Sequence, residues 1–177
     1  GINAMAVFCA SLKDTVSADL LAELLSRAGA GIVLNTTGFA IANPAADPET
    51  EAAPTPFDEL DCPVLQVILS GGAQSAWREG TAGLSPRDIA MNVALPEIDG
   101  RIISRAISFK GAAGRDDRTQ CDIVTYQPVA DRVEFVARLA ARWLRLRAAP
   151  VSERRVALLL ANYPNRDARI GNGVGLD

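Results

Sequence analysis

The chain contains no histidine and only two lysines, Lys13 and Lys110, among its 177 residues. Without histidine, these residues cannot supply a histidine general base, a histidine-oriented nucleophile or a histidine-ligated metal site. The other basic residues are arginines, and the net charge of -3 with a pI near 5.1 argues against a nucleic-acid footprint. Candidate sites must therefore be sought among other residue types.

Cysteine is also scarce, since Cys9, Cys62 and Cys121 lie far apart and form no Cys-x-x-Cys motif. Two of them lie in apolar or strand-like contexts and are expected to be buried free thiols, which predicts a reducing, cytoplasmic compartment. No apolar run approaches the roughly 18 residues that cross a bilayer, and the first residues carry no charged region typical of a signal peptide. We therefore expect neither a membrane nor a nucleic acid as a partner.

Short apolar segments alternate with helical patterns, which is typical of an α/β fold. The segments expected to be strands are 4–10, 31–34, 63–69, 101–109, 122–126 and 155–161. A leucine-rich helix with Ser17 as its N-cap connects the first two strands as a β-α-β unit. We therefore predict an α/β fold with a mostly parallel sheet flanked by helices in three layers.

Two further helices have clear signals. Ser85-Pro86-Arg87-Asp88 places serine at the N-cap, proline at the first helical position and an acid at the capping-box position. This helix is expected to run to about Val93 and to stop before Pro96. Residues 131–147 predict an amphipathic helix, whose apolar stripe is Val136, Leu139, Trp143 and Leu146. A short helix over 73–79 is expected to pack Trp77 inward, and residues 111–118 to form a polar turn.

The last residues resemble an interrupted structural unit. The predicted strand 155–161 leads into the glycine-rich segment 162–177, which normally delivers the chain to a covering helix. No such helix follows, so we interpret residues 1–177 as a single α/β segment of a larger multidomain subunit, truncated before its next helix. The proline-rich loop 43–56 is expected to be mobile.

Glu97 and Asp99 are the first candidate site. In an extended segment, residues i and i+2 point the same way, so both carboxylates would face one cleft. Carboxylate oxygens suit a divalent cation and can accept protons, so both residues are candidate catalytic groups and Glu97 a candidate metal ligand. The alternative is a solvated turn between a helix and a strand.

The glycine-rich tail is the second candidate site, and its proposed ligand-binding residues are Arg166, Arg169, Asn172, Gly171 and Gly173. Alternate glycines allow close backbone approach to a ligand, and arginine forks suit carboxylates. The pattern is neither the dinucleotide fingerprint nor a P-loop, so we expect no ATP site here. The alternative is a structural loop.

Three weaker candidates complete the list. The loops 35–38 and 70–72 follow predicted strands and could line a cleft at the carboxyl edge of the sheet, or they are ordinary turns. Arginines on the polar face of the long helix could dock an acidic partner, or they are a solvated face. These arginines are Arg138, Arg142 and Arg145.

Segments 63–72, 83–102 and 162–177 together resemble one protein family. The stretch Ala-Leu-Pro-Glu-Ile-Asp-Gly at 94–100 is the most specific match. On these segments the chain is similar to the CobN/magnesium chelatase H subunit family, which includes the large subunit of aerobic cobaltochelatases. The resemblance spans nearly the whole chain, whereas that subunit is several times longer.

The resemblance implies a tetrapyrrole-binding subunit of an ATP-dependent cobaltochelatase, which inserts Co²⁺ into hydrogenobyrinic acid a,c-diamide in aerobic cobalamin biosynthesis. Co²⁺ is then a substrate, and ATP with Mg²⁺ is used by separate AAA+-type motor subunits and not bound here. Glu97 would deliver the metal and accept pyrrole protons, and further metal ligands would come from the remaining domains of the subunit. The alternatives are a scaffold or docking domain without a ligand of its own, and a small-molecule-binding α/β module.

Overall fold

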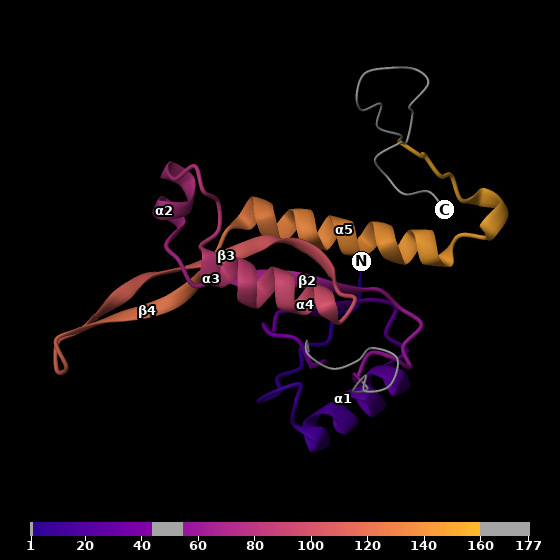
Figure 1. Ribbon diagram of the computed structural model, residues 1–177, viewed down its shortest axis with the longest axis horizontal. Coiled ribbons are helices and arrows are strands. Elements are labelled where there is room, and N and C mark those ends of the chain that lie inside the picture. The colour runs from indigo at the N-terminus through magenta and orange to yellow at the C-terminus, as the bar shows by residue number, and fades with distance from the viewer. Residues whose placement is uncertain (1, 44–54, 160–177) are drawn as a thin grey trace. The chain divides into compact units, whose positions relative to one another are not determined.

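The computed structural model describes residues 2–43 and 55–159, and its centre is a four-stranded sheet with the order β1-β2-β3-β4 (Figure 1). The strands are β1 (Val33–Asn35), β2 (Val64–Ser70), β3 (Ile102–Asp116) and β4 (Cys121–Pro128). The first three are parallel and β4 runs antiparallel to β3. The predicted α/β class is confirmed. The sheet is mixed and not all parallel, because its last strand, β4, is antiparallel.

The helices are α1 (Thr15–Ala28), α2 (Gln74–Glu79), α3 (Pro86–Ile89), the π-helical segment η1 (Ala90–Ala94), α4 (Leu95–Ile98) and α5 (Ala130–Ala148). The run from α3 to α4 lies on one side of the sheet and α5 on the other (Figure 1). The cluster that joins the sheet to α2 and η1 contains Ile68, Ala106, Phe109, Trp77 and Val93. Arg105 is adjacent to Ala106 and so points to the opposite face, where its guanidinium lies 3.2 Å from the ring centre of Phe135 in α5. Trp77 packs inward as expected.

A second buried cluster joins α1 to the edge of the sheet. It is built from Leu12, Leu25 and Phe57, with Val33 and Val64 of the paired strands β1 and β2 packed against it. The start of α1 differs from the prediction, because Asp14 and not Ser17 is the N-cap. The Asp14 carboxylate accepts hydrogen bonds from the Ser17 backbone N–H at 2.9 Å and from the Ser17 hydroxyl at 2.5 Å. Ser17 is therefore the third helical residue, which the capping side chain reaches.

The predicted strand 4–10 is wrong, since this segment has no regular structure. Within the described part of the chain, β1 pairs only with β2, and residues 4–10 have no partner strand. A short apolar run forms a strand only where a neighbour supplies the hydrogen bonds. The expected β-α-β unit is therefore not formed, because its first strand is missing. β1 pairs in parallel with β2, the next strand along the chain.

The helix that begins at Ser85 continues through Pro96, contrary to the prediction. Proline inside an α-helix lacks an N–H and collides with the carbonyl four residues earlier. Here the turn before it is widened into η1, in which the Leu95 N–H donates to the carbonyl of Ala90 five residues back. This π turn lets the chain accept Pro96 inside α4 and end only at Ile98.

The predicted turn at 111–118 is mostly wrong, because the turn covers residues 117–120 and only 117 and 118 belong to it. β3 continues to Asp116, and β4 returns beside it as an antiparallel ribbon that projects past the helices (Figure 1). β4 supplies hydrogen bonds along the ribbon, so polar and glycine residues are tolerated in the strand, with a register shift between Ala112 and Gly114. The long helix is confirmed as α5, although Leu146 of its predicted stripe is exposed.

The chain divides into two compact units, 1–147 and 148–177. In the second unit, residues 151–153 form a 3₁₀ turn, and the predicted strand is not formed over 155–159. Residues 160–177 and most of the proline-rich loop lie outside the described residues. No helix in the described ranges is long and apolar enough to span a bilayer.

Candidate functional site

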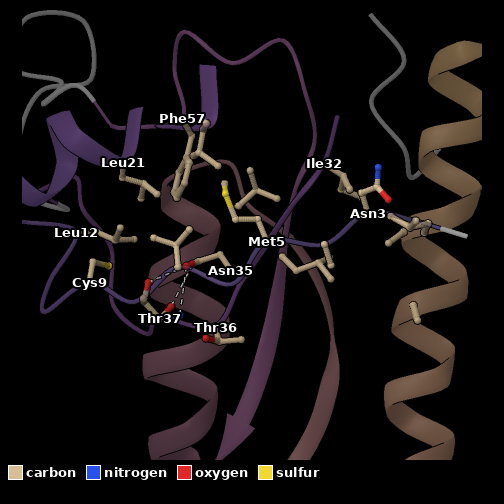
Figure 2. Close-up of a pocket in the computed structure, with 18 residues that line it drawn as sticks. Asn3, Met5, Cys9, Leu12, Leu21, Ile32, Asn35, Thr36, Thr37 and Phe57 are labelled. Atoms are coloured by element: carbon tan, nitrogen blue, oxygen red, sulfur yellow. Dashed lines mark hydrogen bonds between the residues drawn. The ribbon is translucent and has the colours of Figure 1, made fainter. Parts of the chain in front are cut away.

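A cavity of about 460 Å³ opens where β1 ends (Figure 2). Its polar end is formed by Asn35, Thr36 and Thr37, and the rest of its wall is mostly apolar. The apolar wall comes from the N-terminal segment, α1, α5 and the chain before β2; labelled examples in Figure 2 are Met5, Leu21 and Phe57. The loop 35–38 therefore lines a cleft, which is one of the two roles that the sequence left open for it.

A second hollow of about 510 Å³ adjoins this cavity, because Leu12 and Thr37 line both. It is bounded by residues 10–13, by residues 37–41 and by Arg101. Lys13 and Arg101 are its charged lining residues, and the Arg101 charge is paired with the buried Asp99 carboxylate. The two spaces together form a cleft with one apolar part and one more polar part.

A buried polar network forms the wall between the cleft and the sheet. The Asn35 side-chain amide donates to Gln66 Oε1 at 2.8 Å, and the Gln66 amide donates to the carbonyl of Thr37 at 3.0 Å. Arg101 Nη1 donates to the same two acceptors, each at 3.1 Å. Asn35, Gln66 and Arg101 are all buried. This network fixes the loop after β1 onto β2 and β3.

Asp99 completes the network. Its carboxylate accepts from Arg101 Nη2 at 2.6 Å and from the backbone N–H groups of Ile41 and Ala42 at 2.8 to 3.1 Å. The Asp99 and Arg101 side chains are 0% and 1% exposed. Burial lowers the pKa of the Arg101 guanidinium, and the charge of Asp99 opposes that shift. Asp99 thus holds both Arg101 and the loop that follows Gly38.

Glu97 lies in a different environment from Asp99. The expected extended segment is wrong, because Glu97 belongs to α4 and Asp99 is its C-cap residue, with φ -81° and ψ 10°. The Glu97 side chain is exposed and the Asp99 carboxylate is enclosed. The two carboxylates therefore do not share one open cleft within the described residues.

Asp88 is a buried carboxylate that connects the start of α3 to loop 70–72. Its N–H donates to the capping Ser85 hydroxyl at 3.1 Å, so the predicted N-cap is confirmed. Its side chain does not reach back to Ser85 but accepts from the Ser70 hydroxyl at 2.8 Å and from the Gly71 N–H at 3.0 Å. The loop 70–72 is thereby tied to α3. Because β2 extends four residues beyond Gln66, the register partner of Asn35, this loop lies roughly 13 Å along the strand from the end of β1.

Loop 70–72 is therefore separated from the cleft that loop 35–38 lines. The sequence analysis did not predict this difference between the two loops, and it did not predict the roles of Asn35, Gln66 and Arg101. One signal was available, since Gln66 is a polar residue inside the otherwise apolar run 64–69. Buried polar side chains in a central strand normally have partners.

The remaining candidates are the arginines of α5 and the residues of the glycine-rich tail. Arg138 pairs with Glu134 on the exposed face of α5, and Arg142 lies beside them around a shallow hollow. The tail residues lie outside the described residues, namely Arg166, Arg169, Gly171, Asn172 and Gly173. Within residues 2–43 and 55–159, no three histidine, cysteine, aspartate or glutamate side chains are grouped as a metal site.

The fold and the cleft define an α/β segment with an amphipathic cleft beside its first strand. A family model described as CobN/Magnesium Chelatase matches residues 1–177. The chain is 49% identical to the aerobic cobaltochelatase subunit CobN of a Sinorhizobium species and 50% identical to that of Pseudomonas aeruginosa, over 177 residues and 100% of this chain in both cases. The chain belongs to the CobN/magnesium chelatase family.

A solved structure, the catalytic subunit of cobaltochelatase from Mycobacterium tuberculosis, has the same fold. It aligns with a TM-score of 0.72 at 33% sequence identity and covers 93% of this chain. The chain spans 14% of the length of the two CobN relatives and 13% of that solved chain. The chain therefore matches one segment of each of these longer relatives.

Proposed function

We propose that this chain is a segment of the tetrapyrrole-binding subunit of an ATP-dependent cobaltochelatase, which inserts Co²⁺ into hydrogenobyrinic acid a,c-diamide. The observation that carries the proposal is about 50% identity to CobN subunits along the entire chain. In this proposal, AAA+-type motor subunits in the cytoplasm hydrolyse ATP with Mg²⁺, and this segment binds neither. The remaining domains of the same subunit supply the other metal ligands.

The amphipathic cleft supports a role in holding the macrocycle. Ligand sites commonly combine an apolar wall with a few fixed polar groups, and the cleft beside Thr37 has both. In the same proposal, the tail residues Arg166, Arg169, Asn172, Gly171 and Gly173 bind the substrate's carboxylates.

Glu97 is our proposed metal-delivering and proton-accepting group. Metal insertion displaces the pyrrole N–H protons, so the reaction requires a base near the macrocycle. Glu97 is exposed, so a cation and a proton can reach its carboxylate from solvent. Asp99 contributes to catalysis by holding Arg101 and the loop after Gly38 in place.

Glu97→Gln in the full-length subunit tests this role. We expect Co²⁺ insertion to fall by about 100-fold, within the range typical of a lost acid–base group, while the corrinoid binds with unchanged Kd. Glu79→Gln is the matched control, since Glu79 is also an exposed glutamate at the end of a short helix. Insertion at the wild-type rate by the Glu97 variant would remove this residue from the mechanism.

A scaffold role is the second candidate function. It is favoured by the lack of any grouped metal-ligating side chains in the described part of the chain. In that case, activity would survive substitution of both Glu97 and Arg169 in the full-length subunit, and the segment would serve to position the other domains.

A further inference from the structure

We propose that the apolar cavity beside β1 is the binding site of a further strand of the sheet, which another part of the full-length subunit supplies. The occupant is a parallel, apolar strand of about five residues from outside residues 1–177. This inference rests on one part of the proposed function, namely that these residues belong to a longer subunit. The chain covers 14% of the length of its two CobN relatives. The inference does not depend on the metal or on the macrocycle.

β1 has an unpaired edge in the described part of the chain, because its only partner there is β2. The Val33 N–H donates to the carbonyl of Pro63 at 3.0 Å, on the side of β2. Backbone groups of consecutive residues in a strand point to opposite edges, so the N–H and carbonyl of Leu34 point away from β2. Residues 32–35 all line the cavity. The cavity therefore lies along a strand edge that still offers hydrogen bonds.

The two edges of the sheet differ in how they are protected against pairing. Natural sheets protect an exposed edge with a charge, a proline or a bulge. β4 carries Asp122 and Pro128, and its register with β3 shifts between Ala112 and Gly114. β1 has the sequence Val-Leu-Asn and an unbroken register with β2, so it has none of these devices. Its sequence is typical of a strand that has a neighbour on each side.

The cavity lies between the two helical layers, where the sheet would continue. Val64 of β2 packs against the cluster that contains α1, and Ile68 of β2 belongs to the cluster that contains η1. These two residues are four apart in one strand, so α1 and η1 lie on the same side of the sheet, and α5 lies on the other (Figure 1). Leu25 of α1 and Ala137 of α5 nevertheless line one cavity. Helices that cover both sides of an open space beside a strand are the surroundings of a buried parallel strand.

The walls of the cavity determine the chemistry of its occupant. Ile2, Met5 and Val7 of the N-terminal segment line the cavity and are 41% to 52% exposed, and Leu34 is 47% exposed (Figure 2). Covering these side chains with apolar groups is favourable. Parallel strands that are covered on both faces are nearly continuous runs of valine, isoleucine and leucine. The occupant is therefore an apolar strand and not a charged peptide.

A strand in this position leaves the polar end of the cleft available. Loop 35–38 and the adjoining hollow are formed by residues that follow β1 in the chain. In open α/β sheets, ligands bind beyond the carboxyl ends of the strands. The added strand extends the sheet beneath that end, so it is compatible with a macrocycle bound beside Thr37.

Photo-cross-linking in the full-length subunit identifies the occupant. Photoleucine replaces Ala137, which is exposed and lines the cavity, and mass spectrometry then identifies the cross-linked peptides. Ala130 is the matched control, because it is an exposed alanine of the same helix and is not a lining residue of the cavity. We expect position 137 to cross-link to one apolar segment of the same molecule outside residues 1–177. Position 130 should not cross-link to that segment.

Three other results at position 137 would overturn the inference. They are a cross-link between two copies of the subunit, cross-links to residues 1–177 alone, and reaction with water alone. Each would mean that no strand from the rest of the subunit occupies the cavity.

Hydrogen exchange of the unmodified subunit, resolved to single residues, keeps the test independent of the variants. The N–H groups of Val33 and Leu34 are adjacent but face opposite edges of β1, so Val33 is the internal reference. We expect Leu34 to exchange within about tenfold of the rate of Val33, as two hydrogen-bonded amides of one strand do. If the edge is open, Leu34 should exchange about 100-fold faster than a protected amide. Such rapid exchange at Leu34, whatever the rate at Val33, would contradict a bound strand.

Failure of this inference is distinguishable from failure of the proposed function. Co²⁺ insertion by a subunit in which Leu34 exchanges rapidly would leave the proposed function standing and remove the strand. A cross-linked strand in a subunit that does not insert Co²⁺ would support the strand and contradict the proposed function.

Discussion

The Asp99–Arg101 pair allows a quantitative test of the buried network. Asp99→Asn keeps an oxygen that can accept from Ile41 or Ala42 but removes the negative charge beside Arg101. The two side chains are 0% and 1% exposed, so solvent cannot replace the missing charge. Breaking a buried ion pair by removing one partner costs about 3 kcal/mol or more, because the other charge is left uncompensated.

That free energy corresponds to an increase of about 100-fold in local opening. Hydrogen exchange of the full-length subunit measures it directly, because the Ile41 and Ala42 N–H groups donate to the Asp99 carboxylate. We therefore expect their protection to fall by about that factor. The double variant Asp99→Asn with Arg101→Gln should recover much of the loss, since no charge then remains buried alone.

Asp122→Asn is the matched control. Asp122 pairs with Arg115 at 3.5 Å, but these side chains are 61% and 56% exposed. A solvent-exposed pair contributes less than about 1 kcal/mol, so exchange near the control site should change by less than about fivefold. If Asp99→Asn were as mild as Asp122→Asn, the network would not hold the loop after β1, and the reasoning would be refuted.

Two smaller predictions concern pKa values. Hydrogen bonds from the Ser17 side chain and backbone lower the pKa of Asp14 below its ordinary 3.8, so this cap stabilises α1 above that pH and the effect is lost as the pH falls through the lower folded value. A carboxyl NMR titration should show the Asp14 pKa rising in Ser17→Ala, and an unchanged value would contradict the contribution of the Ser17 hydroxyl. Burial raises the pKa of the Cys62 thiol, and nearby Arg147 only partly offsets this. Iodoacetamide should therefore modify the exposed Cys121 before Cys62, as followed by mass spectrometry; equal rates would contradict it.

The elements that the sequence predicted well have strong local signals. β2 is a mostly apolar run, interrupted by Gln66, that is buried on both faces, and such runs are typical of central parallel strands. α5 shows a helical apolar period over 19 residues, which is long enough to distinguish it from a strand. The cap at Ser85 combines serine and proline at fixed positions, and both act within a single turn.

The elements that it missed depend on partners distant in sequence. Segment 4–10 has the composition of a strand, but no neighbouring strand pairs with it among the described residues. The ribbon at 111–116 has the composition of a turn, yet β4 returns along it. In both cases, the structure depends on hydrogen bonding to another segment. That pairing cannot be inferred from the local propensity of the residues.

The same distinction explains the candidate site. Glu97 and Asp99 were found as a pair because carboxylates at i and i+2 are visible in the sequence, but their environments were predicted incorrectly. The helix continues through Pro96 only because η1 widens the preceding turn. Because the helix continues, Glu97 lies on its exposed side. Asp99, at the end of the helix, lies beside the buried Arg101.

One short motif can therefore serve two purposes. The helix end presents an exposed carboxylate, and two residues later the chain anchors that end to the sheet through an enclosed ion pair. A rigid support restricts the positions that the exposed carboxylate can occupy, which favours catalysis by orientation. If Glu97 delivers the metal, weakening the Asp99 anchor should therefore lower the rate of insertion even though Asp99 itself does not contact the substrate.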